Sequence, residues 1–453
     1  MSADPGNASG KAGLADALAA APEDKVVKIL SLVDTLPNRK VADAMIAPLR
    51  PRLAAMAPLR ALTTRRLLFL PLDAVIVPTH CWAPATGLIP RGILAPVFER
   101  LAPLLGEAGR REAEIRALRA DDAAGIDRLG RPLWQAAAAR VLGLDPEGDW
   151  AELGLDKGQR QGVLASMELV FRSIPGLRAL PALAAESPEA LREGLGTLLA
   201  DASFCGLDAW TLVLNLLLDP FADIQTPQTG GFATAVVDIA TQTAAARPEP
   251  RIRKLLEAGL ARALARTVQI GRSLADQVEA MPHNDGARLC LRLMRSATLL
   301  GELAAVSGVP AQDRDDMRAL RTRIIALLAR RLEAIMDAEI MHGMLQFVAP
   351  PDVARPVNLV ALEAQATTAR SIISWLAIAD PAAADVRSWL DSATALLAAT
   401  ADHPAASPPA HALAPHPPAP VSPMLVRFLR LAELVFGTPQ ALRLAAAAGW
   451  HPG

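Results

Sequence analysis

The clearest pattern of apolar and polar positions lies in residues 251–401, where apolar residues recur three and four positions apart. This spacing is typical of helices that bury one face. The first segment, residues 251–281, places these apolar residues on its stripe: Ile252, Leu256, Leu260, Leu264, Val268, Leu274 and Val278. Similar segments with short connections follow at residues 286–306, 313–341, 356–379 and 382–401. Because short connections place consecutive helices antiparallel, we predict an antiparallel helical bundle over residues 251–401.

A second amphipathic pattern follows a proline-rich segment near the C-terminus. Prolines recur throughout residues 402–422, and such a composition forms a linker rather than a packed core. Residues 423–453 then predict a C-terminal amphipathic helical unit tethered by this linker. Its apolar residues gather on one side: Leu425, Phe428, Leu429, Val435 and Phe436. Because such a face is normally covered, we expect it to dock on its own bundle or to bind a protein partner.

The N-terminal half has a less regular pattern. We predict a disordered N-terminus at residues 1–10 and an irregular helical domain over residues 11–246. Within this domain, residues 60–105 are apolar but interrupted by prolines at every six or seven positions, namely Pro71, Pro78, Pro84 and Pro90. Each proline interrupts a helical hydrogen-bond ladder. The apolar runs at residues 67–70 and 74–77 favour an extended conformation, so we predict an apolar extended loop covered by helices in an all-α fold.

Composition and charge narrow the class of protein. Of the 453 residues, 52% are apolar but only 4% are aromatic, and the apolar content is mainly alanine and leucine, which favour helices. The net charge of −1 argues against a sequence-independent nucleic-acid binder. Three widely spaced cysteines indicate neither a disulfide framework nor a metal site. No signal peptide or membrane-spanning segment is indicated, so we predict a cytoplasmic protein.

Candidate chemistry is sparse. The chain has no G-x-S-x-G, H-E-x-x-H, C-x-x-C or P-loop motif, so we assign no catalytic, cofactor-binding or metal-binding residue and expect no cofactor. Glu339 and His342 form one E-x-x-H pair, whereas carboxylate-bridged metal sites in bundles need two. His80 and Cys81 adjoin, but neighbours in sequence rarely form a nucleophile–base pair. The sequence therefore favours a non-enzymatic protein over an enzyme.

Three arginines flank the apolar loop and are candidates for anion binding, namely Arg65, Arg66 and Arg91. Charged residues beside a buried loop usually hydrogen-bond its backbone carbonyls or form ion pairs. The functional alternative is a pocket for a phosphate or carboxylate, lined by their guanidinium groups.

The interpretation that these patterns favour is a non-enzymatic helical interaction protein, an adaptor or assembly factor using exposed or tethered amphipathic helices. We expect a protein partner, or intramolecular docking, through the C-terminal helix and no nucleic-acid partner. The alternative is a small-molecule-binding protein or enzyme with a pocket built by residues 60–105. Attachment of the C-terminal helix to a membrane surface is a further alternative. No pattern indicates an oligomeric state.

Overall fold

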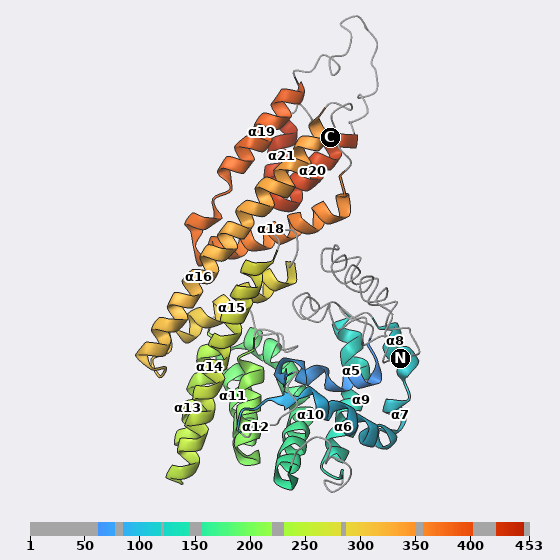
Figure 1. The fold of residues 1–453 in the computed structure, drawn as a ribbon, viewed down its shortest axis with the longest axis vertical. Coiled ribbons are helices and arrows are strands. Elements are labelled where there is room, and N and C mark those ends of the chain that lie inside the picture. The colour runs from blue at the N-terminus through green and yellow to red at the C-terminus, as the bar shows by residue number, and fades with distance from the viewer. Residues whose placement is uncertain are drawn as a thin grey trace, which may run out of the picture. The chain divides into compact units, whose positions relative to one another are not determined.

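The computed structural model describes residues 62–77, 85–118, 122–144, 156–219, 231–281, 287–349, 357–401 and 423–447. These residues are predominantly helical, and their only strands are β1 (Ile76–Val77) and β2 (Ile89–Pro90) (Figure 1). The predicted all-α fold is confirmed. The predicted disordered N-terminus at residues 1–10 and the linker at residues 402–422 lie outside the described residues.

The chain forms two compact units. The first comprises the described residues up to Ser273 together with Arg295–Arg321, and the second comprises Leu274–Met294 and the residues from Thr322 onward. Three long helices contribute residues to both units: α14 (Pro250–Ala280), α15 (Ala287–Leu303) and α16 (Ala311–Ile335). The domain boundary predicted at residues 246–251 stays a prediction. Helix α14 begins there, at Pro250, and the two units divide between Ser273 and Leu274 of this helix.

The first unit is built around two central helices, α10 (Lys157–Glu186) and α12 (Leu207–Leu217). The other helices of this unit before α14 are α5 (Thr64–Phe69), α6 (Leu94–Leu101), α7 (Gly106–Gly109), α8 (Glu112–Ala117), α9 (Ala123–Val141), α11 (Pro188–Cys205) and α13 (Phe232–Ala245). Helix α10 packs against α9, α11 and α12, and α11 packs against α13. Every residue from Ala209 to Leu217 is buried, as expected for a segment that is apolar on all sides.

Capping residues mark the beginnings of the central helices. The Asp156 carboxylate accepts a hydrogen bond from the Gln159 N–H, and the Gln159 side chain accepts one from the Asp156 N–H, which forms a capping box. Ser187 accepts the Ala190 N–H, with Pro188 in the first turn of α11. The Ser187-Pro188 pair is thus a local sequence signal for the start of this helix.

The apolar stretch at residues 60–105 differs from its prediction at the first run. Residues 67–70 are not extended, because Thr64–Phe69 form α5 and Leu70–Val75 form the 3-10 helix η2. Pro71 lies in the first turn of this helix, where a missing N–H costs no hydrogen bond. The second run is extended only at its end, where Ile76 pairs with Ile89 and Val77 with Pro90 in a parallel ladder.

This stretch is part of the core of the first unit. Leu67, Leu68, Leu72 and Val75 are completely buried. The Trp134 indole N–H donates to the Leu67 carbonyl at 3.0 Å. This hydrogen bond gives the buried Leu67 carbonyl a partner near the junction of the α-helix and the 3-10 helix.

The loop before β2 lies directly on α12. The Asn215 amide donates to the carbonyls of Thr86 and Gly87 at 2.9 and 3.1 Å. Gly87 has a φ of +62°, and a Cβ added there would lie 2.3 Å from the Leu212 backbone nitrogen. Both the left-handed conformation and the close approach of two backbones therefore require glycine at this position.

The second unit contains the C-terminal helices together with parts of α14, α15 and α16. After α16 come a π-helical turn, η6 (Met336–Met341), α17 (His342–Val348), α18 (Leu359–Ala379), η7 (Pro381–Ala384), α19 (Arg387–Ala401), α20 (Pro423–Phe436) and α21 (Thr438–Ala447). Helix α20 packs against α17, α18 and α21, and α19 packs against α17 and α21 (Figure 1). Within this unit Arg323 of α16 forms ion pairs with Asp276 and Glu279 of α14, at 2.8 and 2.6 Å.

The position of Gly87 makes a testable prediction. Replacing Gly87 with alanine should lower the free energy of unfolding by roughly 2–5 kcal/mol, because left-handed strain and a backbone clash act together. Urea denaturation followed by circular dichroism measures this loss.

Gly106→Ala is the matched control. Gly106 also has a positive φ, +57°, but an added Cβ meets no atom within 4 Å. Its substitution should cost only the strain, about 1–2 kcal/mol. Equal losses in the two variants would contradict the close packing of Gly87 on α12.

Candidate functional site

The described residues hold neither a grouped set of metal ligands nor a helix that could span a membrane. Within the part of the chain that the structure describes, no three His, Cys, Asp or Glu side chains are grouped to hold a metal ion. Glu339 lies in the π-helical turn and His342 begins α17, where its ring nitrogen lies 3.5 Å from the Gln346 amide. His80 and Cys81 lie outside the described residues. None of the described helices is long and apolar enough to cross a membrane.

The arginines predicted to bind an anion lie on two elements of the first unit. Arg65 and Arg66 belong to α5, where Arg65 is exposed and Arg66 half-buried, and Arg91 is exposed at the start of the 3-10 helix η3 (Arg91–Ile93). None of the three lines either of the pockets described below. Anion binding by these residues stays a prediction.

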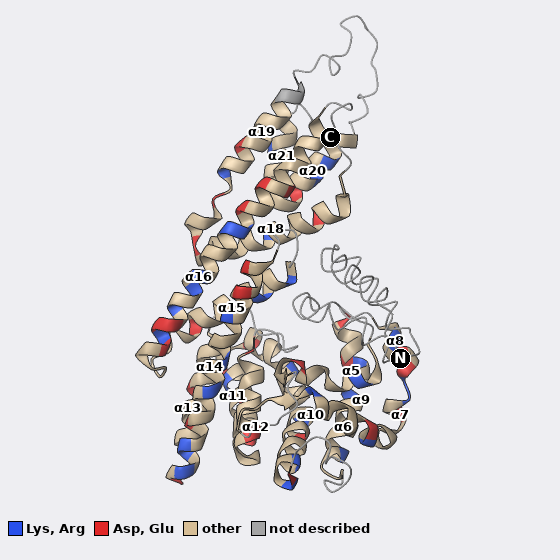
Figure 2. Cartoon of the chain, viewed as in Figure 1, with Lys and Arg blue, Asp and Glu red and all other residues tan. Residues whose placement is uncertain are grey.

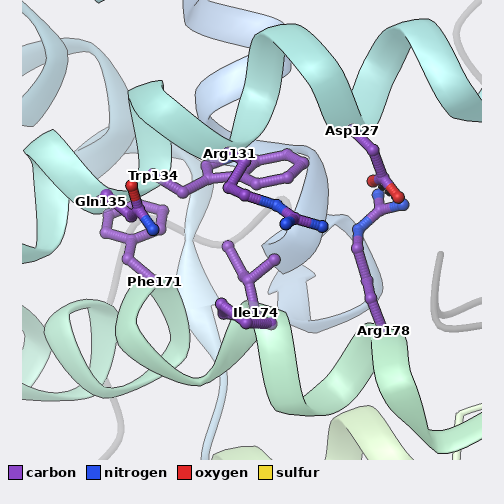
Figure 3. Close-up of a pocket in the computed structure, with 8 residues that line it drawn as sticks. Asp127, Arg131, Trp134, Gln135, Phe171, Ile174 and Arg178 are labelled. Carbon is purple, nitrogen blue, oxygen red and sulfur yellow. Dashed lines mark ion pairs between the residues drawn. The ribbon is translucent and has the colours of Figure 1, made fainter.

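The first pocket lies between α9 and α10 (Figure 3). Its lining residues are Asp127, Arg131, Trp134, Gln135, Phe171, Ile174, Pro175 and Arg178. The Arg178 guanidinium lies 5.1 Å from the centroid of the Trp134 ring and forms an ion pair with Asp127. In Figure 3 the Arg131 side chain extends along Trp134 toward this pair.

This pocket is too small for an organic ligand. Its volume is about 10 Å³, which is room for one water molecule. Trp134 is almost completely buried and already donates its N–H to Leu67. The cation–π contact and the ion pair therefore stabilise the packing of α9 against α10, and they do not form a binding site.

Acidic and basic side chains are interspersed along α16. Figure 2 shows both signs interspersed along α16. In this helix Arg318 pairs with Asp315 at 2.7 Å. Such pairing is typical of an exposed helix face in water.

A half-buried carboxylate in α12 holds the loop before β2. Asp208 accepts a hydrogen bond from the Ala85 N–H at 2.5 Å, and Arg262 donates to the Ala85 carbonyl at 3.1 Å. Among the described residues Ala85 is the one non-glycine residue with a positive φ, +62°. Burial raises the pKa of Asp208 above its ordinary value, and the Ala85 N–H and the Arg262 charge offset only part of that rise.

The second pocket is a groove in the second unit and is much larger. It has a volume of about 140 Å³. Its lining residues are Phe347 of α17, Leu359, Leu362 and Glu363 of α18, and Val426, Arg427, Arg430 and Leu431 of α20. An apolar cavity of roughly 150 Å³ can accept a benzene ring, so this groove has room for one large apolar group.

The floor of the groove is apolar, and one apolar side chain at its rim is exposed. Phe347, Leu362 and Leu431 are buried in the floor. At the rim Val426 is 50% exposed. Val426 therefore adds exposed apolar surface beside the apolar cavity.

The charges at the rim come from two helices. Arg430 of α20 forms an ion pair with Glu433 at 3.0 Å. Arg427 lies beside it on the same helix, and no carboxylate of the described residues lies within ion-pair distance of its guanidinium. Glu363 of α18 is exposed and likewise has no ion pair among the described residues. The α20 side of the groove is therefore basic and the α18 side acidic.

The residues predicted to bind a partner are mostly buried. Phe428, Leu429, Val435 and Phe436 are buried, and Leu425 is half-buried. Helix α20 thus presents its apolar stripe to its own unit, where it packs against α17, α18 and α21. Gly437, with a φ of +91°, ends the helix, and Arg370 donates to the Val435 carbonyl at 3.3 Å.

The groove residues themselves were missed in the sequence. Val426, Arg427 and Arg430 belong to the outer side of α20, outside the apolar stripe from which partner binding was predicted. One signal was available: Val426 is an apolar residue outside that stripe, directly before Arg427 and one helical turn before Arg430.

Comparison with known proteins gives no relative: no protein-family model, no curated protein and no solved structure matches this chain.

The raised pKa of Asp208 predicts a pH-dependent stability. The native state binds this proton more tightly than the unfolded chain, so Asp208 stabilises the fold fully below its ordinary pKa of 3.8, and this contribution is lost as pH rises through the folded pKa. Asp208→Asn keeps an acceptor for the Ala85 N–H without a buried charge. Its unfolding free energy, relative to wild type, should increase between about pH 4 and about pH 7.

Glu112→Gln is a control of opposite sign. Burial alone would raise the pKa of Glu112, but hydrogen bonds from Thr64 and Arg116 outweigh it and hold the pKa below its ordinary value. Glu112 therefore stabilises the fold above pH 4.5. The free energy of unfolding of Glu112→Gln should be lower than that of the wild type at neutral pH, and this difference should shrink on acidification. A pH-independent difference for Asp208→Asn would contradict the burial of its charge.

Proposed function

We propose that this protein is a non-enzymatic helical interaction protein, an adaptor or assembly factor, that binds a partner protein in the groove between α17, α18 and α20. The observation that carries the proposal is the groove itself. It combines a 140 Å³ cavity, a buried apolar floor and a rim on which Val426 is exposed.

The energetics favour an apolar side chain as the occupant. Burying one Leu, Phe or Met side chain contributes about 1.5–3 kcal/mol to binding. Covering the exposed side chain of Val426 at the rim adds to this free energy. Helix-in-groove recognition uses apolar anchors of this kind. A groove with room for one anchor supports a weak or moderate partner interaction rather than an obligate interface.

In this proposal the C-terminal helix has a different role from the one that its apolar stripe suggested. It forms one wall of the groove rather than the segment that leaves the protein to bind elsewhere. Its buried residues Phe428 and Val435 support that wall, and its outer residues Val426 and Arg427 meet the partner. Partner binding then requires no undocking of α20, which would expose its apolar stripe to water.

A cytoplasmic location belongs to the same proposal. It rests on the sequence, in which three widely spaced cysteines favour a reducing compartment.

Photo-crosslinking tests the proposed function. The full-length chain carrying p-benzoylphenylalanine at position 426 is expressed in cells of its source organism and irradiated. We expect a discrete adduct with a second polypeptide, because position 426 faces the groove. Leu359→Asp in the same chain should abolish the adduct by placing a charge on the apolar wall of the groove.

Position 378 is the matched control. Ile378 lies near the C-terminal end of α18, is 87% exposed and does not line the groove. A probe there should give no discrete adduct. Equal crosslinking from positions 378 and 426, or none from position 426, would contradict a partner site in the groove.

A further inference from the structure

We infer that the occupant of the groove is an acidic amphipathic segment of a partner protein, which places one large apolar side chain in the cavity and a carboxylate beside Arg427. This inference rests on the proposed function and adds the chemistry of the partner. It combines the cavity at the junction of α17, α18 and α20 with the unequal charges on its two walls.

The cavity limits the size of the anchor. A volume of 140 Å³ accepts one ring-sized or isobutyl-sized group. The floor residues Phe347, Leu362 and Leu431 offer only apolar atoms to that group, so a polar anchor would lose its hydrogen bonds with water without replacement.

The charges at the rim determine which charge is favourable on the partner residues that flank the apolar anchor. Arg427 lies on the α20 wall, and none of the described carboxylates pairs with it, whereas Arg430 shares its charge with Glu433. An acidic side chain in the partner can therefore pair with Arg427 without breaking an existing ion pair. On the opposite wall Glu363 disfavours an acidic residue and accommodates a basic one.

The opposite charges of Arg427 and Glu363 on the two walls also favour one direction of the bound segment. On a helix, residues three or four positions apart lie on one face, so an anchor and a carboxylate with that spacing reach the cavity and Arg427 together. Reversing the segment would bring its carboxylate toward Glu363. Charge pairs at such a rim contribute mainly to specificity and association rate.

Selection from a displayed library of random peptides on the full-length protein tests the inference. On the wild type we expect enriched peptides that combine one Leu, Phe or Met with an Asp or Glu three or four positions away. The variant Arg427→Glu, which leaves only acidic side chains on the two facing positions 363 and 427, should enrich peptides with the same anchor but a Lys or Arg in place of the acid. An acidic peptide selected on the wild type should bind Arg427→Glu roughly tenfold more weakly.

Arg443→Glu is the control for a general charge effect. Arg443 is exposed on α21 and does not line the groove, so this variant should select the wild-type peptides. An unchanged consensus in Arg427→Glu, or wild-type peptides with an anchor but no acidic preference, would overturn the inference and leave the proposed function intact.

Two further outcomes separate the remaining possibilities. If wild-type enrichment is absent, or persists in Val426→Asp, the groove binds no peptide anchor, and the proposed function fails together with the inference. Flotation with phosphatidylserine vesicles that is lost in Arg427→Glu would assign the groove to an anionic lipid surface and overturn the protein partner.

Discussion

The structure of the second unit depends on one constraint, which is that the apolar stripe of α20 must be removed from water. Phe428 and Val435 are completely buried, and their helix packs against α17 and α18. Each such side chain contributes about 1.5–3 kcal/mol when it is buried. Because this docking fixes α20 beside α18, the outer residues Val426 and Arg427 meet Leu359 and Glu363 across a groove. The proposed site is therefore a consequence of how the C-terminal helix is covered.

The helices were predictable wherever their signals are local. Three- and four-residue apolar spacing marks α14, and Ser187 with Pro188 marks the start of α11. The run at residues 67–70 was wrongly predicted to be extended, because the effect of Pro71 depends on its position in a helix. The run is also held by Trp134 of α9, whose indole N–H donates to the Leu67 carbonyl. No local sequence pattern could reveal this contact.

The groove was less predictable than the fold because its walls come from segments far apart in the chain. The sequence identified the apolar stripe of α20 and left open whether it docks on its own unit or on a partner. It had no information that Leu359 and Leu362 would lie opposite Val426, because that proximity arises only from tertiary packing. Asp208 shows the same limit, since its raised pKa follows from burial beside Ala85 of a distant segment.

Hydrogen–deuterium exchange of the α20 amides in the full-length protein tests most directly whether this helix is a docked wall of the groove. We predict that the amides of Phe428–Phe436 are protected, that protection does not depend on protein concentration, and that Phe428→Asp abolishes it. Exchange of these amides in the wild type at the rate of an unstructured peptide would contradict the docked helix and the groove that it forms.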